Sequence, residues 1–533
     1  MHVEGTHGSP ASDRRPVVAM VALSVLALAA YMVAGRHVGF FYDEWDFVLG
    51  RQAWTADAVL QPHNEHISVL PVLAYKALFD TVGLHHHWPY RALLALLYAG
   101  CGLVVFLLAR RRVGGWMAVV AGGLVLVMGR AAENILWAFQ IGFVGSVLGG
   151  LLALLALDQR SVRGDRLACA ALVAAALCSS LGVPFAIGVS AELLARRRWR
   201  ALWIPGVSLV MYAVWWVGFG RGRSHVTVDS ATQAVTWSLD AAAAAAGGAA
   251  GLSVEWGRVL LVLLVVVIAV RVARAGRISP RLAGLAVTAA VFWVLTGAAR
   301  SLTEDPATSR YMTLGAVVIL LIAMELVDGW EPPGRALGLG CAVVIVAALA
   351  GLPSLRSYAH SLRDASRAVD AELAAMSLVR SAVPSAFQPD PTLAPQITAG
   401  PYFAAVDRLG SAPADTPAAL RDALNTDRAH ADLVLQRLVV RAAPAGPRNG
   451  RSCRRVAPGA TGLAVLGPSG VIVEPGGTSA DVRVERFSDG FVNPPIALPR
   501  ATRRVLVTRS PDASDVPYHV QITAPRGALI CRG

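Results

Sequence analysis

Three carboxylates stand close together a few residues after the first long apolar run of the chain. They are Asp43, Glu44 and Asp46, within the string Phe-Phe-Tyr-Asp-Glu-Trp-Asp-Phe at positions 40–47. The apolar run at 17–35 spans roughly 19 residues, enough at about 1.5 Å per residue to cross a hydrocarbon core of about 30 Å. Placing carboxylates beside a bilayer costs free energy, so they are usually found there only where they have a function. The pattern therefore predicts a site that takes up a proton, binds a cation, or does both.

The same loop carries a second polar string, Pro-His-Asn-Glu-His at positions 62–66, which adds His63, Glu65 and His66. The histidine spacing matches neither H-E-x-x-H nor H-x-x-E-H, so it does not by itself indicate zinc. Three roles stay open for these residues: metal ligation, hydrogen bonding to an acceptor sugar, and capping of the apolar helix expected at 68–79. For a divalent cation such as Mg²⁺ or Mn²⁺, the candidate ligands are Asp43, Glu44 and His66.

Arginines beside predicted spans offer a different chemistry. Arg300 and Arg310 flank a short loop, and Tyr311 opens the following span. The planar guanidinium can bind two phosphate oxygens at once, which makes both arginines candidate phosphate contacts. The alternative is an arginine that snorkels to the interface beside an interfacial tyrosine. Arg221 and Arg223, in another loop expected outside, are further candidate phosphate contacts.

A third polar group lies in the loop expected at 131–140. Glu133, Asn134 and Gln140 stand there with Trp137. An acid and two amides beside an aromatic ring suit sugar binding, because a sugar can stack on the ring face. A tryptophan of the interfacial aromatic belt is the alternative explanation.

Composition indicates a membrane protein with many spans. Of 533 residues, 55% are hydrophobic and only 16% are charged, whereas soluble domains average about 25% charged residues. Mean hydropathy is +0.53. The formal charge of +13 does not indicate nucleic-acid binding, because the arginine clusters stand at the ends of apolar runs, where membrane topology explains them.

Apolar runs and arginine positions together predict about eleven crossings, with the N-terminus inside and the C-terminus outside. Arg14 and Arg15 precede the first span, which holds that end in the cytoplasm by the positive-inside bias and makes the first span an uncleaved anchor. The expected spans are 17–35, 88–108, 115–128, 141–157, a hairpin over 167–194, 201–219, 260–270, 282–296, 312–326 and 337–352. The hairpin is expected to break at 179–184, where glycine and proline occur.

The alanine-rich stretch from Thr232 to Leu252 is expected to be an external or interfacial helix. If it crossed the membrane, the basic segment 271–281 would lie outside, against the charge bias. The sequence therefore predicts a mainly α polytopic protein with a C-terminal soluble α+β region. Its expected parts are a transmembrane domain at 1–355, an external helical region at 356–445 and an external β-sandwich at 446–533, in which short β runs alternate with turn residues.

Two of the six cysteines bracket that last region. Cys453 and Cys531 have no other cysteine between them. If the region is exported, the oxidising compartment permits a disulfide between them; two free thiols are the alternative. The other four cysteines lie in apolar runs and are expected to behave as small buried hydrophobic residues.

The arrangement resembles the GT-C class of integral-membrane glycosyltransferases. The resemblance covers residues 1–355 and rests on a first span, an acidic pair in the first external loop, a helix along the membrane surface and many further spans. The strings Y-D-E-W-D-F, P-H-N-E-H and E-N-I-L-W-A-F-Q resemble an uncharacterised bacterial branch of the class. Members use polyprenyl-phosphate-linked sugars, and an aspartate of the first-loop motif acts as the base or positions the acceptor. The resemblance implies that role for Asp43, with Glu44 as its partner in the D-E motif.

This resemblance implies a bacterial plasma-membrane enzyme that moves a hexose or pentose from a polyprenyl phosphate to an envelope glycan, lipid or protein on the external face. The C-terminal sandwich resembles, in layout, the carbohydrate-binding domains of cell-wall members. Two other classes stay open. A transporter or flippase of lipid-linked intermediates commonly has broken helices in two matching halves, and only one break is evident here. A non-catalytic envelope scaffold leaves the cost of the first-loop acids unexplained.

Overall fold

The computed structural model describes residues 14–221, 226–330, 333–412, 419–445, 452–476, 480–498, 504–509, 512 and 514–532. The chain forms two compact units. The first, called here the helical unit, comprises Met1–His37, Ala53–Leu78 and Trp88–Ser361. The second, the C-terminal unit, comprises Val38–Gln52, Phe79–His87 and Leu362–Gly533. The acidic first-loop segment therefore folds with residues from the far end of the chain.

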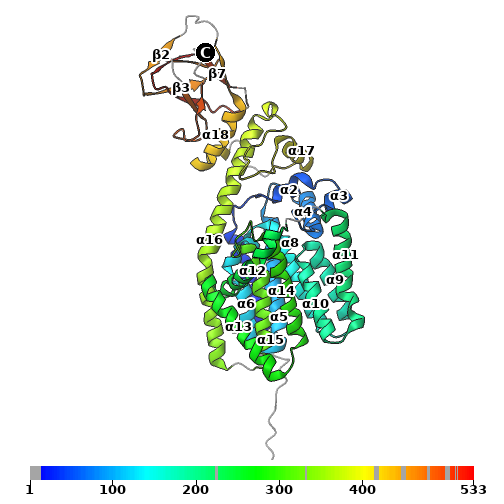
Figure 1. The fold of residues 1–533 in the computed structure, drawn as a ribbon. Coiled ribbons are helices and arrows are strands. Elements are labelled where there is room, and N and C mark those ends of the chain that lie inside the picture. The colour runs from blue at the N-terminus through cyan, green and yellow to red at the C-terminus, as the bar shows by residue number, and fades with distance from the viewer. Residues whose placement is uncertain are drawn as a thin grey trace, which may run out of the picture. The chain divides into compact units, whose positions relative to one another are not determined.

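Long apolar helices lie side by side in the helical unit (Figure 1). Its elements are α1 (Arg15–Ala34), α3 (Ala56–Leu60), α4 (Val69–Thr81), α5 (Trp88–Val113), α6 (Gly115–Leu126), α7 (Ala132–Leu136), α8 (Ile141–Leu157), α9 (Val162–Cys178), α10 (Gly182–Ala195), α11 (Trp203–Trp215), α12 (Val228–Ala249), α13 (Val254–Ala275), α14 (Pro280–Arg300), α15 (Ser309–Leu326) and the first part of α16 (Gly334–Leu378). Short helical turns η1 (Gly129–Ala131), η2 (Ala138–Gln140), η3 (Trp199–Ala201) and η4 (Trp216–Gly220) join or extend them.

Within the described residues, nine helical segments are long and apolar enough to cross a membrane. All nine correspond to spans expected from the sequence, and the two remaining expected crossings are the shorter helices α9 and α10. The break between α9 and α10 falls at residues 179–181, inside the predicted stretch. The chain is a multi-pass membrane protein, and the predicted fold class is confirmed.

The alanine-rich helix α12 packs closely on its neighbours. Residues 241–249 of α12 are all buried, and the helix packs on α13, α14 and α15. A Cβ added at Gly257 of α13 would lie 1.9 Å from the carbonyl oxygen of Ala243, so only glycine permits this approach. Small residues let membrane helices approach closely. Helix α12 is therefore packed within the helical unit and is not one of the nine candidate spans, and its expected external or interfacial position stays a prediction.

The long helix α16 departs from the expected boundary. It continues through Pro353 without ending, whereas the sequence analysis ended a span at 352 and placed a separate external helical region from 356. Proline inside a helix removes one backbone hydrogen bond and usually breaks or kinks it. Here the flanking residues continue the helix on both sides, and the division between the units falls at Leu362, inside α16.

Arginines at helix ends of the helical unit are more than topological signals. Arg281 of α14 is 4% exposed, and its guanidinium contacts Asp158 at 2.7 Å and Glu192 at 2.9 Å. Arg112 of α5 is paired with Glu325 of α15. The explanation of these clusters by topology alone is therefore incomplete, because two of the arginines pair with carboxylates of other helices, of which Glu192 is buried.

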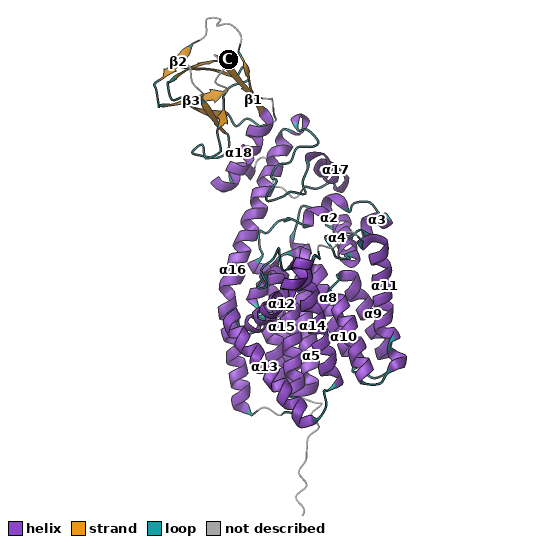
Figure 2. Ribbon diagram, viewed as in Figure 1, coloured by secondary structure: helices purple, strands orange, loops and turns teal. Residues whose placement is uncertain are grey.

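The C-terminal unit contains all described strands of the chain (Figure 2). Its helices are α2 (Glu44–Gly50), the end of α16, α17 (Ala399–Leu409) and α18 (Asn425–Val439), with turns η5 (Arg380–Ala382) and η6 (Ala419–Arg421). Its strands are β1 (Val440–Pro444), β2 (Cys453–Val456), β3 (Thr461–Leu466), β4 (Val471–Pro475), β5 (Asp481–Glu485), β6 (Ile496–Ala497), β7 (Val505–Arg509), β8 (Tyr518–Thr523) and β9 (Ala528–Arg532).

These strands form two antiparallel sheets, in the orders β1-β7-β4-β9-β2 and β3-β8-β5-β6. Along β8, Tyr518, Val520 and Ile522 are buried and alternate with more exposed residues. This period of two is typical of a strand with one face on a core. Cys453 of β2 lies opposite Cys531 of β9, and the two form a disulfide.

Candidate functional site

The first-loop acids sit at the start of the short helix α2, and Glu44 is the one that the fold buries. Its side chain is 0% exposed. Oε2 accepts a hydrogen bond from the backbone N–H of Phe41 at 3.1 Å, and Oε1 lies 2.9 Å from Nε2 of His87. Both carboxylate oxygens are therefore engaged inside the C-terminal unit.

The hydrogen-bond partners of His87, which pairs with Glu44, indicate where two hydrogens lie. Its Nδ1 is 3.0 Å from the carbonyl oxygen of Val38, and a carbonyl can only accept, so Nδ1 carries a hydrogen. A proton must also lie between Nε2 and Glu44, carried either by the imidazole or by the carboxyl group. This buried pair ties α2 to the segment before α5. The sequence analysis gave His87 no role, and no spacing rule connects residues 44 and 87.

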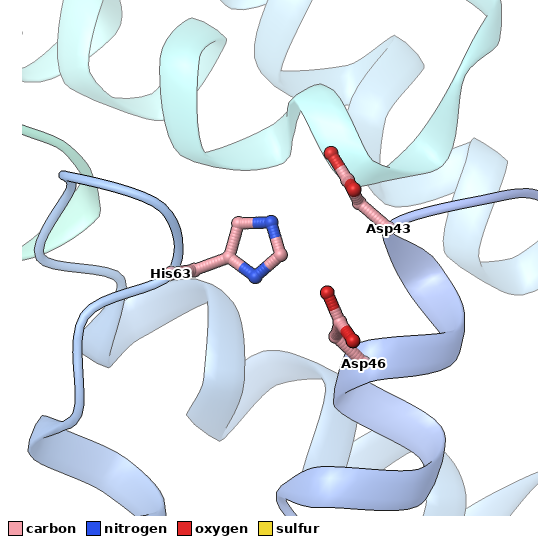
Figure 3. Close-up of side chains that lie close together, drawn as sticks. All are labelled: Asp43, Asp46 and His63. Carbon is pink, nitrogen blue, oxygen red and sulfur yellow. The ribbon is translucent and has the colours of Figure 1, made fainter. Parts of the chain in front are cut away.

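Asp43 and Asp46 differ from Glu44 because both remain half-buried. Figure 3 shows their side chains projecting from the start of α2, and a carboxylate oxygen of one lies within 4.8 Å of an oxygen of the other. Tyr42, just before them, adopts φ 46°, a left-handed conformation that costs a residue with a side chain about 1–2 kcal/mol. The paired aspartates can accept a proton or supply two ligands to a divalent cation, whereas Glu44 would have to break its existing bonds to do so.

The histidine string forms a tight turn in the helical unit. His63 and His66 exchange backbone hydrogen bonds at 3.0 and 2.9 Å, and Asn64 between them has φ 52°. The turn follows α3 (Figure 3 labels His63). The ring of His66 packs edge-on against Phe143 with centroids 5.3 Å apart. Burial, followed by the positive charge of Arg300, lowers the pKa of His66 to about 3, so this imidazole is neutral at physiological pH.

A network of acids and arginines connects the loop at 301–308 with the polar segments before α8. Arg300 contacts Glu65 at 3.3 Å and Glu304 at 3.6 Å. Arg310 contacts Glu133 at 3.2 Å and Glu304 at 3.9 Å. All of these residues belong to the helical unit. Three carboxylates thus share two guanidinium groups in this network.

Arg310 is held more tightly than Arg300. Its backbone N–H donates to Glu133 Oε2 at 3.0 Å, and its carbonyl oxygen accepts from Asn134 Nδ2 at 2.9 Å. Asn134 also donates to Thr313 Oγ1 at 2.8 Å. Glu133 and Asn134, which the sequence suggested for sugar binding, therefore anchor the start of α15. Gln140 is 2% exposed, and its Oε1 has no hydrogen-bond partner among the described residues.

An open cavity of about 340 Å³ lies within the helical unit and carries polar groups in a mainly apolar wall. Its polar groups include Glu65, His66, Arg300 and Tyr311. Its apolar residues come from the helix break and from α8, α11, η4 and α14: Phe143, Leu181, Val183, Pro184, Trp216, Phe292, Leu295 and Ala299. Tyr311 donates from its hydroxyl to Glu304 at 2.9 Å. A cavity of this size and character is typical of a site for a small amphipathic ligand.

The structure thus brings four of the sequence-predicted site residues to one cavity and leaves others in supporting positions. Glu65, His66, Arg300 and Tyr311 are in its wall, whereas Arg310 is not among its described lining residues. Arg221 is exposed and lies over the ring of Trp216 at 5.9 Å. Arg223 lies outside the described residues. The sequence analysis did not assign the break at 179–184 to a site, although its serines, glycine and proline marked a place where helix packing opens.

Comparisons with known proteins leave the family open. No model of a known protein family matches the chain, and no curated protein sequence matches it. Among solved structures, the chain is similar to ArnT from Cupriavidus metallidurans, determined bound to undecaprenyl phosphate. The TM-score is 0.43 at 16% sequence identity, over 69% of this chain and 73% of that chain. A likeness of this degree carries no inference about activity.

Proposed function

We propose that this protein is a membrane glycosyltransferase that takes a sugar from a polyprenyl-phosphate donor and transfers it to an envelope glycan, lipid or protein on the external face. The observation that carries the proposal is the cavity of the helical unit, because one wall combines a guanidinium with an extended apolar surface. A polyprenyl phosphate has the same two parts, a charged phosphate and an apolar chain.

In this proposal Arg300 binds the donor phosphate. Its contacts with Glu65 and Glu304, at 3.3 and 3.6 Å, are ion pairs longer than a well-formed hydrogen bond. A phosphate can therefore compete for the guanidinium at modest cost, and it gains the bidentate geometry that arginine offers. The neutral imidazole of His66 can donate a further hydrogen bond in the same wall, whereas the hydroxyl of Tyr311 would first have to leave Glu304. Arg310, with more bonds to its surroundings, positions α15 instead.

The apolar wall accommodates the first isoprene units of the donor. Leu181, Val183 and Pro184 from the helix break and Phe292 and Leu295 from α14 present aliphatic and aromatic surface. Because a prenyl chain reaches this wall from lipid and not from water, its seating gains mainly packing contacts with these side chains.

Asp43 is proposed as the general base. A sugar hydroxyl is a poor nucleophile, and a positioned carboxylate can accept its proton as the glycosidic bond forms. The leaving polyprenyl phosphate carries away the electron pair of the bond that breaks, and positive charge stabilises it. Asp46 supports Asp43 or shares a divalent cation with it, while the buried Glu44–His87 pair holds α2 in place.

A donor-binding assay tests the site. We expect Arg300→Ala to weaken binding of a polyprenyl phosphate by at least tenfold and Arg300→Lys to weaken it less, because lysine keeps the charge but loses the planar fork. Ala299→Trp should fill the cavity and weaken binding without changing charge. Arg258→Ala is the matched control, since Arg258 forms an exposed pair with Asp240 at 2.8 Å elsewhere on the helical unit. Unchanged affinity in both Arg300 variants would remove this arginine from the donor site.

A transporter or flippase of lipid-linked intermediates is the second candidate, and one observation favours it. The break between α9 and α10 lines the cavity through Ser180, Leu181, Val183 and Pro184, and broken helices commonly form the binding sites of transporters. The two functions separate in detergent, where no compartments exist. Purified enzyme should still transfer labelled sugar from donor to acceptor, whereas a transporter would bind the donor and leave it intact.

A further inference from the structure

We propose that the C-terminal unit holds a structural divalent metal ion, for which Zn²⁺ is the best match, at Glu372, Asp390 and His430. Each residue offers one ligand atom, and these atoms all lie within 4.8 Å of one another. They come from three separate segments: the end of α16, the loop before α17 and the helix α18. These residues are not among those proposed for donor binding or as the general base, and the proposal does not rest on the glycosyltransferase activity.

Glu372 provides the strongest indication of a missing ligand. Its side chain is 1% exposed, and Oε1 contacts His430 Nδ1 at 2.9 Å. The other oxygen, Oε2, is buried and has no hydrogen-bond partner among the described residues. A buried carboxylate oxygen without a partner is costly. A cation bound between Glu372, Asp390 and His430 would remove that cost.

The surroundings already orient the other two ligands. Asp390 Oδ1 accepts hydrogen bonds from the backbone N–H groups of Thr392 at 2.6 Å and Leu393 at 2.9 Å. Arg437 of α18 donates to the carbonyl oxygens of Pro389 at 2.6 Å and Gln388 at 3.0 Å, which fixes the loop just before Asp390. Such second-layer bonds hold metal ligands in position.

Charge and ligand type favour a transition metal over Ca²⁺ or Mg²⁺. Two carboxylates carry two negative charges, which a divalent cation would neutralise, while Arg437 donates to backbone carbonyl oxygens and not to these carboxylates. One imidazole with two carboxylates suits Zn²⁺, which accepts nitrogen and oxygen ligands at about 2.0–2.2 Å. Asp390 and His430 are half-buried, so one side is open to exchange and to a water as the fourth ligand.

A metal at this position would join α16, the loop at 388–393 and α18. The first strand, β1, begins at Val440, directly after α18. The ion would therefore restrain the helices that lead into the β-sheets. Its predicted role is structural, and catalysis is not expected to depend on it.

The test uses the full-length protein in detergent, stripped with a chelator and titrated with Zn²⁺ against a chromophoric competitor. We expect one equivalent to bind with micromolar or tighter affinity and to raise the transition temperature of the protein. Glu372→Gln and His430→Gln should each weaken binding by roughly 100-fold, at or beyond the loss usual for second-layer changes. Asp407→Asn, which alters an exposed carboxylate paired with Arg380 in the same unit, should bind as the wild type does.

Because Asp43 and Asp46 are a second place where a cation could bind, the titration is repeated with Asp46→Asn. Retention of the tight equivalent in that variant, with its loss in Glu372→Gln, assigns it to the proposed site. A second measurement guards against misfolding of the variants: Co²⁺ added to the wild type should give visible absorption that His430→Gln alters. Absence of tight Zn²⁺ binding in the wild type would overturn the proposal, as would wild-type affinity in His430→Gln, or a preference for Ca²⁺ that does not depend on His430.

Discussion

Single residues of the first loop divide into one buried anchor and two accessible carboxylates. The sequence singled out the cluster, because charge beside an apolar run is visible without a structure. It did not separate the roles of Glu44 and Asp43, because burial and the bond to His87 depend on tertiary packing across 43 positions. The same limit applies to Arg300 and Arg310, which the sequence treated alike and which differ in their contacts.

Asp43→Asn tests the proposed base. Asparagine keeps the size and much of the hydrogen bonding of Asp43 but cannot accept a proton, so turnover should fall by about 10²–10⁴-fold while donor affinity stays near wild type. The measurement is transfer of labelled sugar from a polyprenyl-phosphate donor by the purified variant. Asp46→Asn is the control and should lose less activity. Wild-type turnover in Asp43→Asn would exclude this carboxylate as the base.

Glu44→Gln should behave in the opposite way. The side chain is fully buried and bonded to Phe41 and His87, so replacing the carboxylate disturbs a buried charged hydrogen bond, at a cost of about 1–3 kcal/mol in stability. We expect a lower transition temperature and a smaller yield of folded protein, with turnover per folded molecule largely retained. If stability were unchanged and turnover fell sharply, Glu44 would be the base in place of Asp43.

Helices, strands and helix breaks were predictable where a local sequence pattern alone determines them. The break between α9 and α10 followed from glycine and proline, and the strand-rich region followed from short β runs separated by turn residues. Two elements were not. Pro353 suggested an end that α16 does not make, and the alanines of α12 gave no sign of which neighbours cover them. Both outcomes depend on packing with helices distant in sequence, which local periodicity does not encode.

The disulfide between β2 and β9 should be a major source of stability for the sheets. Cys453 and Cys531 are 78 positions apart, and closing a loop of that length restricts the unfolded chain by about 4 kcal/mol on the loop-entropy estimate. The double variant Cys453→Ser/Cys531→Ser should therefore unfold at a lower denaturant concentration than the wild type. Limited proteolysis of the region after residue 440 measures this unfolding. Cys101→Ser, at a buried free cysteine, is the control. Equal resistance of the double variant and the wild type to proteolysis would show that the disulfide does not stabilise this region.

At the scale of the whole helical unit, a buried charge network joins helices that the sequence leaves unconnected. Arg281 of α14 contacts Asp158 at the end of α8 and Glu192 of α10, and Arg196 contacts Glu192 at 2.6 Å. Arg112 pairs with Glu325, which adds α5 and α15. Hydropathy located these helices, but only the fold reveals which of their charges meet. The network therefore brings particular helix ends into contact.

Arg281→Met measures what that network contributes. The change removes a buried cation from Asp158 and the 1%-exposed Glu192, which keep contacts with Arg112 and Arg196. The loss should therefore be smaller than the roughly 3–5 kcal/mol of a buried pair broken outright. The transition temperature in detergent should fall clearly, whereas Arg258→Met, which breaks an exposed pair, should change it little. Adding Glu192→Met to Arg281→Met should recover part of the loss, because a buried ion pair can often be replaced by apolar side chains at little cost. If the double variant were less stable than Arg281→Met alone, the stabilising contact of Glu192 would be the one with Arg196 and not the one with Arg281.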